Sequence, residues 1–217
     1  MTRNLPIVAL EPALGGRVDE RVDGRVARAR RTRRAIVDAL LALIEEGDVA
    51  PTAPRIAERA GVSLRSIYQH FEDLEALFAA SSTRQIQRMQ ALVAPVDAGL
   101  PRAERVAAFT EQRARLLEAI TPVRRAALLQ EPCSPQLRRS REWVTAMARE
   151  EVSRLFRPEL DAVGPDERAE LLAAIDAVAG WSMWDSLRTS DVAADAARRV
   201  MAKTIDALLA ASTTTQS

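Results

Sequence analysis

The stretch from Thr52 to Phe71 constrains the fold of this chain more than any other. Two short runs with helical spacing of their apolar residues flank the segment Ala60-Gly61-Val62-Ser63. Gly61 is suited to the positive φ of a tight turn, and the Ser63 hydroxyl is suited to cap the following helix. The pattern therefore predicts a helix-turn-helix.

Apolar and polar residues separate onto opposite faces of the second of these helices. Ile67 and Phe71 lie four positions apart, and we expect both to point inward together with Val62. The other side chains are expected to face outward, and most are of types that bind base edges and phosphates. They are Leu64, Arg65, Ser66, Tyr68, Gln69 and His70. This face favours a nucleic-acid-binding element over an inert helical hairpin.

The residue types and spacing from Ile56 to Phe71 resemble the TetR family of transcriptional repressors. Residues 35–47 are similar to that family's first helix, and residues 71–77 are similar to the start of its fourth. The resemblance covers roughly residues 31 to 80, and beyond them only the lengths and order of the helices are similar. It implies a repressor that binds a palindromic operator as a dimer and is released by a small molecule.

We expect an all-α fold of about nine helices, because no segment alternates with period two for long enough to form a strand. An N-terminal three-helix DNA-binding domain would precede a larger ligand-binding and dimerisation domain. The expected divisions are a flexible basic arm (1–30), the DNA-binding domain (31–78), the C-terminal domain (79–211) and a tail (212–217). Outside the motif, the expected helices span residues 31–46, 73–93, 102–120, 122–130, 136–156, 166–187 and 191–211.

Arginine is concentrated just before the first expected helix. Arg28 to Arg34 forms a dense basic run, and we expect Arg31, Arg33 and Arg34 to contact DNA. Residues 1–24 are better interpreted as a solvated tail. Residues 1–71 hold 12 arginines against 9 acidic residues, whereas acidic residues are in excess over the rest of the chain. This asymmetry also favours nucleic acid at the N-terminal end.

Arg65 is the best candidate for a base contact, because a guanidinium group can bridge O6 and N7 of guanine. Ser66 and Leu64 are expected to add short contacts, the latter to a thymine methyl group. Gln69 is suited either to adenine or to the DNA backbone, and the sequence does not choose between these alternatives.

The resemblance implies that Thr52, Tyr68 and His70 contact phosphates. Thr52 is also expected to cap the second helix by accepting a hydrogen bond from the amide of Arg55. Leu74 stands where the family usually has a lysine, so we expect a weaker salt-dependent component of DNA affinity. Arg55 and Ser63 complete the predicted DNA-binding set.

The resemblance also implies a small hydrophobic or aromatic effector that binds in the C-terminal domain. Bulky residues at helical spacing are candidates to line its site, with Arg113 as a polar anchor, although packing in the core is the alternative for each. The candidates are Phe109, Arg113, Leu116, Trp143, Met147, Trp181 and Trp184.

The last two expected helices are rich in alanine, which allows helix axes to approach closely. We expect them to pair with their copies in a second subunit as a four-helix bundle, and the resemblance supports this homodimer. The alternative is that they pack only within the monomer.

Catalytic and metal sites are not expected. His70 is the only histidine and Cys133 the only cysteine, and the chain contains no HExxH, CxxC, P-loop or GxGxxG motif. We therefore expect neither an enzyme nor a bound metal or cofactor. No apolar run is long enough to span a membrane and no signal peptide is recognisable, so we expect a cytoplasmic protein. The alternative function is an all-helical small-molecule sensor or interaction module without DNA binding.

Overall fold

The chain forms only helices over the part that the structure covers. The computed structural model describes residues 20–214, with side chains at residues 24–90 and 93–211. These residues form ten α-helices and a turn of 3-10 helix, so the prediction of an all-α fold of about nine helices is confirmed. The elements are α1 (Glu20–Glu45), α2 (Ala53–Ala60), α3 (Leu64–His70), α4 (Leu74–Leu92), α5 (Arg102–Gln130), η1 (Glu131–Cys133), α6 (Pro135–Leu155), α7 (Arg157–Asp161), α8 (Pro165–Val178), α9 (Trp181–Thr189) and α10 (Ala194–Thr214).

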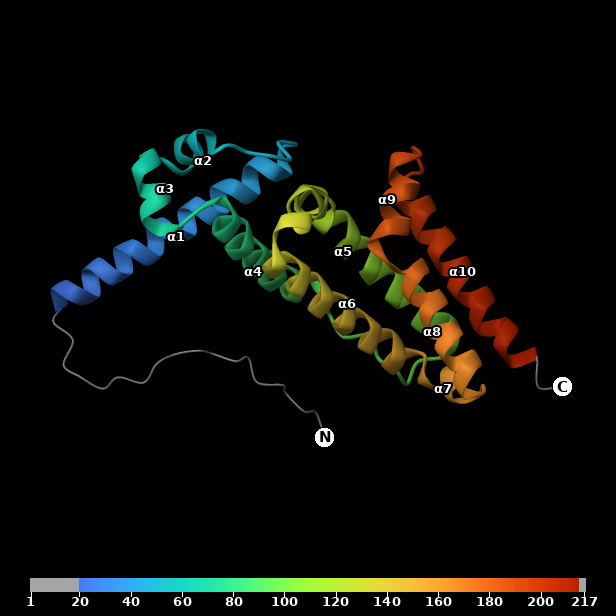
Figure 1. The fold of residues 1–217 in the computed structure, drawn as a ribbon. Coiled ribbons are helices and arrows are strands. Elements are labelled where there is room, and N and C mark those ends of the chain that lie inside the picture. The colour runs from blue at the N-terminus through green and yellow to red at the C-terminus, as the bar shows by residue number, and fades with distance from the viewer. Residues whose placement is uncertain (1–19, 215–217) are drawn as a thin grey trace.

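The three N-terminal helices form one packed unit at an end of the molecule (Figure 1). The predicted turn between α2 and α3 is confirmed, because Gly61 adopts a φ of 66° and the Ser63 hydroxyl accepts a hydrogen bond from the Ser66 amide at 3.2 Å. Ile56 and Ile67 are buried against the apolar side of α1. These contacts fix the angle at which α3 leaves the turn.

The first helix begins earlier than the sequence pattern predicted. We expected an arm up to residue 30 and a helix from residue 31, whereas α1 starts at Glu20. Residues 20–30 contain no proline, and the cost of the single Gly24, about 0.5–1 kcal/mol, does not stop a helix that is already propagating from its buried part. Residues 1–19 of the predicted arm and residues 215–217 of the predicted tail lie outside the described residues, and α10 extends to Thr214.

Helix α4 leads from the N-terminal unit into the body, where α5, α6, α8 and α10 pack together (Figure 1). Asp73 caps α4 as predicted, with its carboxylate 2.7 Å from the amide nitrogen of Ala76. The predicted boundary between residues 78 and 79 falls within this helix. Ala126 of α5 and Leu137 of α6 belong to the same buried cluster as Ile56 and Ile67. The N-terminal unit and the body therefore share one apolar core.

Two predicted helix boundaries in the body are wrong. Pro122 lies inside the continuous α5, where we expected a break, because Leu117 and Ala126 are buried on either side of it and compensate for the lost hydrogen bond. Conversely, the predicted helix 166–187 is divided into α8 and α9 at Gly180. A Cβ atom at Gly180 would lie 3.0 Å from the carbonyl oxygen of Asp176, so the tight turn there favours glycine.

The second core cluster fills the body around large side chains. Phe109, Phe156 and Trp184 are fully buried, and the rings of Phe109 and Phe156 meet edge to face with centroids 5.7 Å apart. Arg105 and Glu159 form a buried ion pair of 2.6 Å between α5 and α7. None of the helices in the described part of the chain is both long and apolar enough to cross a bilayer.

Candidate nucleic-acid interface and internal cavity

Helix α3 separates its residues as the sequence predicted. Ile67 is 1% exposed, whereas Leu64 and Tyr68 are 43% and 54% exposed. Arg65 and Gln69 are also exposed, and Ser66 and His70 are half-buried. An exposed apolar or aromatic side chain on such a short helix is not explained by packing within the subunit. This surface is therefore free to meet another molecule.

Three further candidates lie at the start of α2 and in the turn. Thr52 occupies the N-cap position of α2 and is exposed, but its side chain makes no capping hydrogen bond, so that part of the prediction is wrong. The backbone carbonyl of Thr52 accepts from Ile56 instead, which leaves the hydroxyl available. Arg55 forms a 2.7 Å ion pair with Asp48 while its side chain remains 59% exposed. Ser63 is exposed and bound to Ser66.

The basic candidates before the motif lie on α1, in the part of the helix that was predicted from residue 31 onward. Arg31, Arg33 and Arg34 are all exposed. The guanidinium carbon of Arg33 lies 4.6 Å from the centroid of the Phe71 ring, directly after α3. A helical placement holds these side chains in fixed positions relative to α3, which an extended arm would not do.

Helix α4 is fastened to α1 by ion pairs that were not predicted from the sequence. Arg88 contacts Asp38 and Glu45, each at 3.1 Å, and Arg84 contacts Asp38 at 3.4 Å. Arg84 and Arg88 recur four positions apart on one face of α4, and this spacing is the signal that could have revealed them. Because α4 also contacts α5 and α6, a displacement of α4 would be transmitted to α1.

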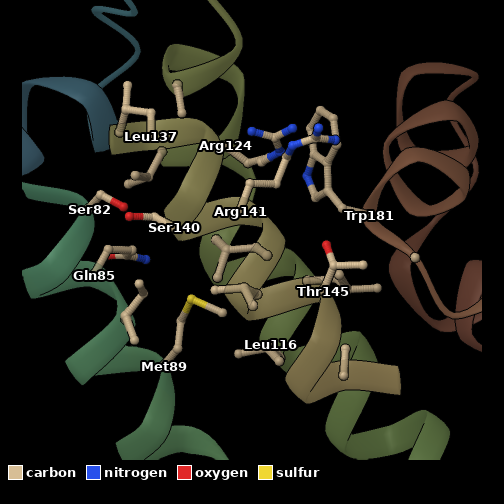
Figure 2. A pocket seen from close by; sticks show the side chains of 18 of the residues that line it. Ser82, Gln85, Met89, Leu116, Arg124, Leu137, Ser140, Arg141, Thr145 and Trp181 are labelled. Atoms are coloured by element: carbon tan, nitrogen blue, oxygen red, sulfur yellow. The ribbon is translucent and has the colours of Figure 1, made fainter. Parts of the chain in front are cut away.

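A cavity of about 240 Å³ lies between α4 and the body helices. Its walls come from α4, α5, α6, α8 and α9, and Ile44 of α1 also contributes. Figure 2 shows Ser82, Gln85 and Met89 of α4 facing residues of α5 and α6 across the space. The cavity is therefore in contact with both the N-terminal unit and the body.

Comparisons with known proteins agree with the geometry of α1 to α4. Residues 36–81 match the family model described as bacterial regulatory proteins, tetR family. These residues therefore form a domain of the kind found in tetR-family regulatory proteins. The match over these residues indicates a DNA-binding transcriptional regulator.

Solved structures resemble this chain along most of its length. A transcriptional regulator from Rhodococcus sp. Rha1 has 20% identity and a TM-score of 0.63, covering 84% of this chain and 96% of its own. A protein classed as a TetR-family transcriptional regulator from Mesorhizobium loti MAFF303099 has 18% identity and a TM-score of 0.58, covering 85% and 98%. No curated protein sequence matches the chain. At these identities the likeness concerns the fold.

Three of the seven predicted effector contacts line the cavity: Arg113, Leu116 and Trp181. The other four lie elsewhere. Phe109 and Trp184 are fully buried in the core of the body, whereas Trp143 and Met147 are 46% and 44% exposed on α6.

Helical phase explains the displacement of Trp143 and Met147. Val144 and Ala148, one position further along α6, face the cavity instead, and one position corresponds to a rotation of about 100°. The polar wall was not predicted either, although Ser81 and Gln85 continue the buried stripe of Leu77 at intervals of four, which was a usable signal. The polar lining residues absent from the prediction are Ser81, Ser82, Gln85, Arg124, Glu131, Ser140, Arg141, Thr145 and Asp176.

Arg113 lines the cavity, but its guanidinium group is already paired with a carboxylate of the protein. Its Nη2 lies 2.7 Å from Glu151 Oε2, and Gln112 donates to the other oxygen of the same carboxylate. Burial lowers the pKa of Arg113, and the carboxylates of Glu151 and Asp176 act in the opposite direction. Burial likewise raises the pKa of Asp176, an effect that its 3.4 Å pair with Arg149 opposes. Burial therefore disfavours the charged form of both groups.

A second charged group lies at another wall of the cavity. Arg124 forms an ion pair of 2.6 Å with Glu131, and the Nε of Arg141 lies 3.4 Å from the same carboxylate oxygen. Trp181 stands beside them, with Arg124 5.5 Å from its ring centroid, and its indole donates a hydrogen bond to Thr121. Figure 2 shows Arg124, Arg141 and Trp181 gathered at one end of the cavity.

Proposed function

We propose that the protein is a repressor that binds a palindromic operator as a homodimer and releases it when a small molecule occupies the cavity. The observation that carries this proposal is the exposed side of α3, where Leu64, Arg65 and Tyr68 face away from the subunit. Such a surface has the width and chemistry of a helix that enters a major groove.

The proposed contacts follow from position on the helix. Arg65 is close to the N-terminal end of α3, where recognition helices commonly reach base edges, and it would read guanine. Tyr68, His70 and Thr52 would bind phosphates, and the exposed arginines of α1 would extend this contact along the backbone. Phosphate contacts add affinity and position the helix, while Arg65 supplies sequence preference.

Dimerisation would use the outer faces of α8 and α10. Ala169, Ala173 and Ala177 recur at intervals of four along α8, and Val200 of α10 is 37% exposed. Small residues at this spacing allow two α8 helices to pack closely, and the inner faces of both helices already bury Ile175 and Ile205 against the body. A two-fold pair would place the α3 helices in successive major grooves, about 34–36 Å apart on straight DNA.

Release by an effector requires that the effector prefer the conformation that does not bind DNA, since equal affinity for both conformations shifts nothing. The cavity is suited to this role because α4 forms one of its walls and is fastened to α1 by Arg84 and Arg88. A molecule that moves α4 would therefore move α1 and the helices packed on it.

Selection of bound duplexes from a random pool by the purified full-length protein tests this function. We expect enrichment of a palindrome whose half-sites lie about one helical turn apart, with a sequence preference that weakens in Arg65→Ala. Failure of any sequence to be enriched, with the protein folded, would contradict the repressor. It would favour the alternative of a small-molecule sensor without DNA binding.

A further inference from the structure

The cavity contains polar atoms that the protein itself leaves unpaired. Gln85 and Arg113 are 8% and 6% exposed, yet Gln85 Oε1 and Arg113 Nε have no hydrogen-bond partner within the described residues. Both residues line the cavity, the first from α4 and the second from α5. Because unpaired buried polar atoms destabilise a fold, they indicate a space that is filled by water or by a bound molecule.

Positive charge is in excess at the end of the cavity beside Trp181. Arg124 and Arg141 share the single carboxylate of Glu131, and the guanidinium nitrogens of Arg141 donate no hydrogen bond to any described residue. Arg124, in contrast, makes two hydrogen bonds to Glu131. An incompletely paired guanidinium next to apolar walls favours an anion, and the two oxygens of a carboxylate match its planar geometry.

The remaining walls are largely apolar. Leu116, Ile120 and Val144 are among the lining residues, and Met89 and Leu116 lie toward the end away from Arg124 and Arg141 (Figure 2). The side chain of Arg141 is 53% exposed, so the charged end is the one in contact with solvent. The cavity of about 240 Å³ exceeds the roughly 150 Å³ that accommodates benzene and is below the usual range for drug-sized ligands.

We propose that the cavity binds a small amphipathic carboxylate. The carboxylate accepts hydrogen bonds from Arg141 beside Arg124 and Trp181, and the apolar body extends toward Met89 and Leu116. Arg141 therefore replaces Arg113 as the polar anchor, because Glu151 already holds Arg113. This inference rests on the proposed effector role of the cavity and specifies the chemical class of the effector.

Calorimetric titration of the full-length protein with matched small molecules tests the charge requirement. The probes are octanoate and 4-phenylbutyrate, each compared with its primary amide and with the amine of the same chain length. We expect at least one carboxylate to bind at least tenfold more tightly than its amide, and the amines not to bind. Equal affinity of acid and amide, tighter binding of the amine, or no binding of either carboxylate would overturn the proposal.

Three variants locate the carboxylate. Arg141→Met should abolish the preference for acid over amide, and Arg141→Lys should retain part of it because the positive charge remains. The matched control is Arg139→Met, which removes an exposed arginine of the same helix that bonds to Gln136 and does not line the cavity. An unchanged preference in Arg141→Met, or an equal loss in Arg139→Met, would contradict the assignment. Far-UV circular dichroism establishes that each variant is folded.

A parallel measurement separates this proposal from the repressor function. Operator binding by the full-length protein is followed by fluorescence anisotropy while the same probes are added. Carboxylates that bind without releasing DNA would contradict effector release and leave the ligand class intact. Release by the amides alone would support the repressor and overturn the ligand class.

Discussion

Arg33 lies over the ring of Phe71, with its guanidinium carbon 4.6 Å from the ring centroid. This contact joins α1 to the residue that ends α3, so the basic part of α1 and the exposed surface of α3 are held in one arrangement. Arg33 thus has a structural partner, whereas Arg31 is exposed and forms no ion pair with the described residues.

Replacement of Arg33 should therefore affect folding as well as DNA binding. We expect Arg33→Ala to lower the free energy of unfolding by about 0.5–1 kcal/mol, the usual range for an exposed cation–π contact. Arg31→Ala is the control, and it should weaken DNA binding without changing stability. Urea denaturation followed by circular dichroism measures the difference, and equal stability of the two variants would contradict the role of the Phe71 contact.

Removal of the Arg65 side chain should reduce sequence discrimination. We expect Arg65→Ala to weaken binding to the selected operator by about 1–3 kcal/mol and to change binding to unrelated DNA much less. Arg115→Ala, which removes a 71% exposed arginine of α5, serves as the control and should change neither. Anisotropy titrations with both duplexes measure the ratio. A proportional decrease on both duplexes would reassign Arg65 to phosphate binding.

The exposed arginines of α1 should contribute to the salt dependence of binding. For the double variant Arg31→Ala, Arg34→Ala, the slope of log affinity against log salt should become shallower by about 0.9 for each phosphate that is no longer neutralised. Titrations at four or more salt concentrations give the slope. If the slope equals that of the unmodified protein, these side chains do not reach DNA.

Two glycines should respond in opposite directions to replacement by alanine. Gly61 adopts a φ of 66°, so Gly61→Ala should destabilise the fold by about 1 kcal/mol, although no atom would obstruct the new methyl group. Gly24 lies within α1 with open space around it, and Gly24→Ala should stabilise the helix by about 0.5–1 kcal/mol. Denaturation midpoints of the two variants would show whether backbone conformation, rather than available space, determines if each replacement raises or lowers stability.

Titration of Asp176 should make stability depend on pH. Because burial raises the pKa of Asp176 above its ordinary value of 3.8, the folded state holds the proton more tightly than the unfolded state does. Its contribution is present below pH 3.8 and is lost as the pH rises through the raised value. Asp176→Asn does not titrate, so its stability relative to the unmodified protein should increase over this rise. Unfolding free energies of both proteins, measured from pH 4 to pH 7, test this expectation. If the ion pair with Arg149 outweighs the effect of burial, the relative stability of Asp176→Asn should decrease instead.

Local signals predicted the N-terminal unit well. Gly61, Ser63 and the spacing of Ile67 and Phe71 specify the turn and the inward face of α3, because backbone conformation and helical period act over a few residues. The body was predicted less accurately because the ends of its helices depend on contacts with residues that are distant in the sequence. Pro122 remains within α5 because residues on both sides of it are buried. The chain leaves helical geometry before Gly180, where a carbonyl oxygen of the preceding turn lies close to this glycine.

The cavity illustrates the same difference between local and tertiary information. The sequence indicated that bulky residues such as Trp143 and Trp181 were candidates, but it did not specify the rotation of α6. One position of helical phase separates the exposed Trp143 from Val144 in the cavity wall. A polar residue on a buried stripe, such as Gln85, was a usable signal that the prediction missed, because burying a polar side chain without a partner has a cost.

Ala126 and Leu137 come from the body, yet they are buried in the cluster that supports α2 and α3. A chimera that joins residues 20–81 to the body of another protein would therefore lose two of the buried apolar side chains in the cluster that supports α3. Any domain exchange in this chain must carry matching side chains at these two positions, or redesign the surface they cover.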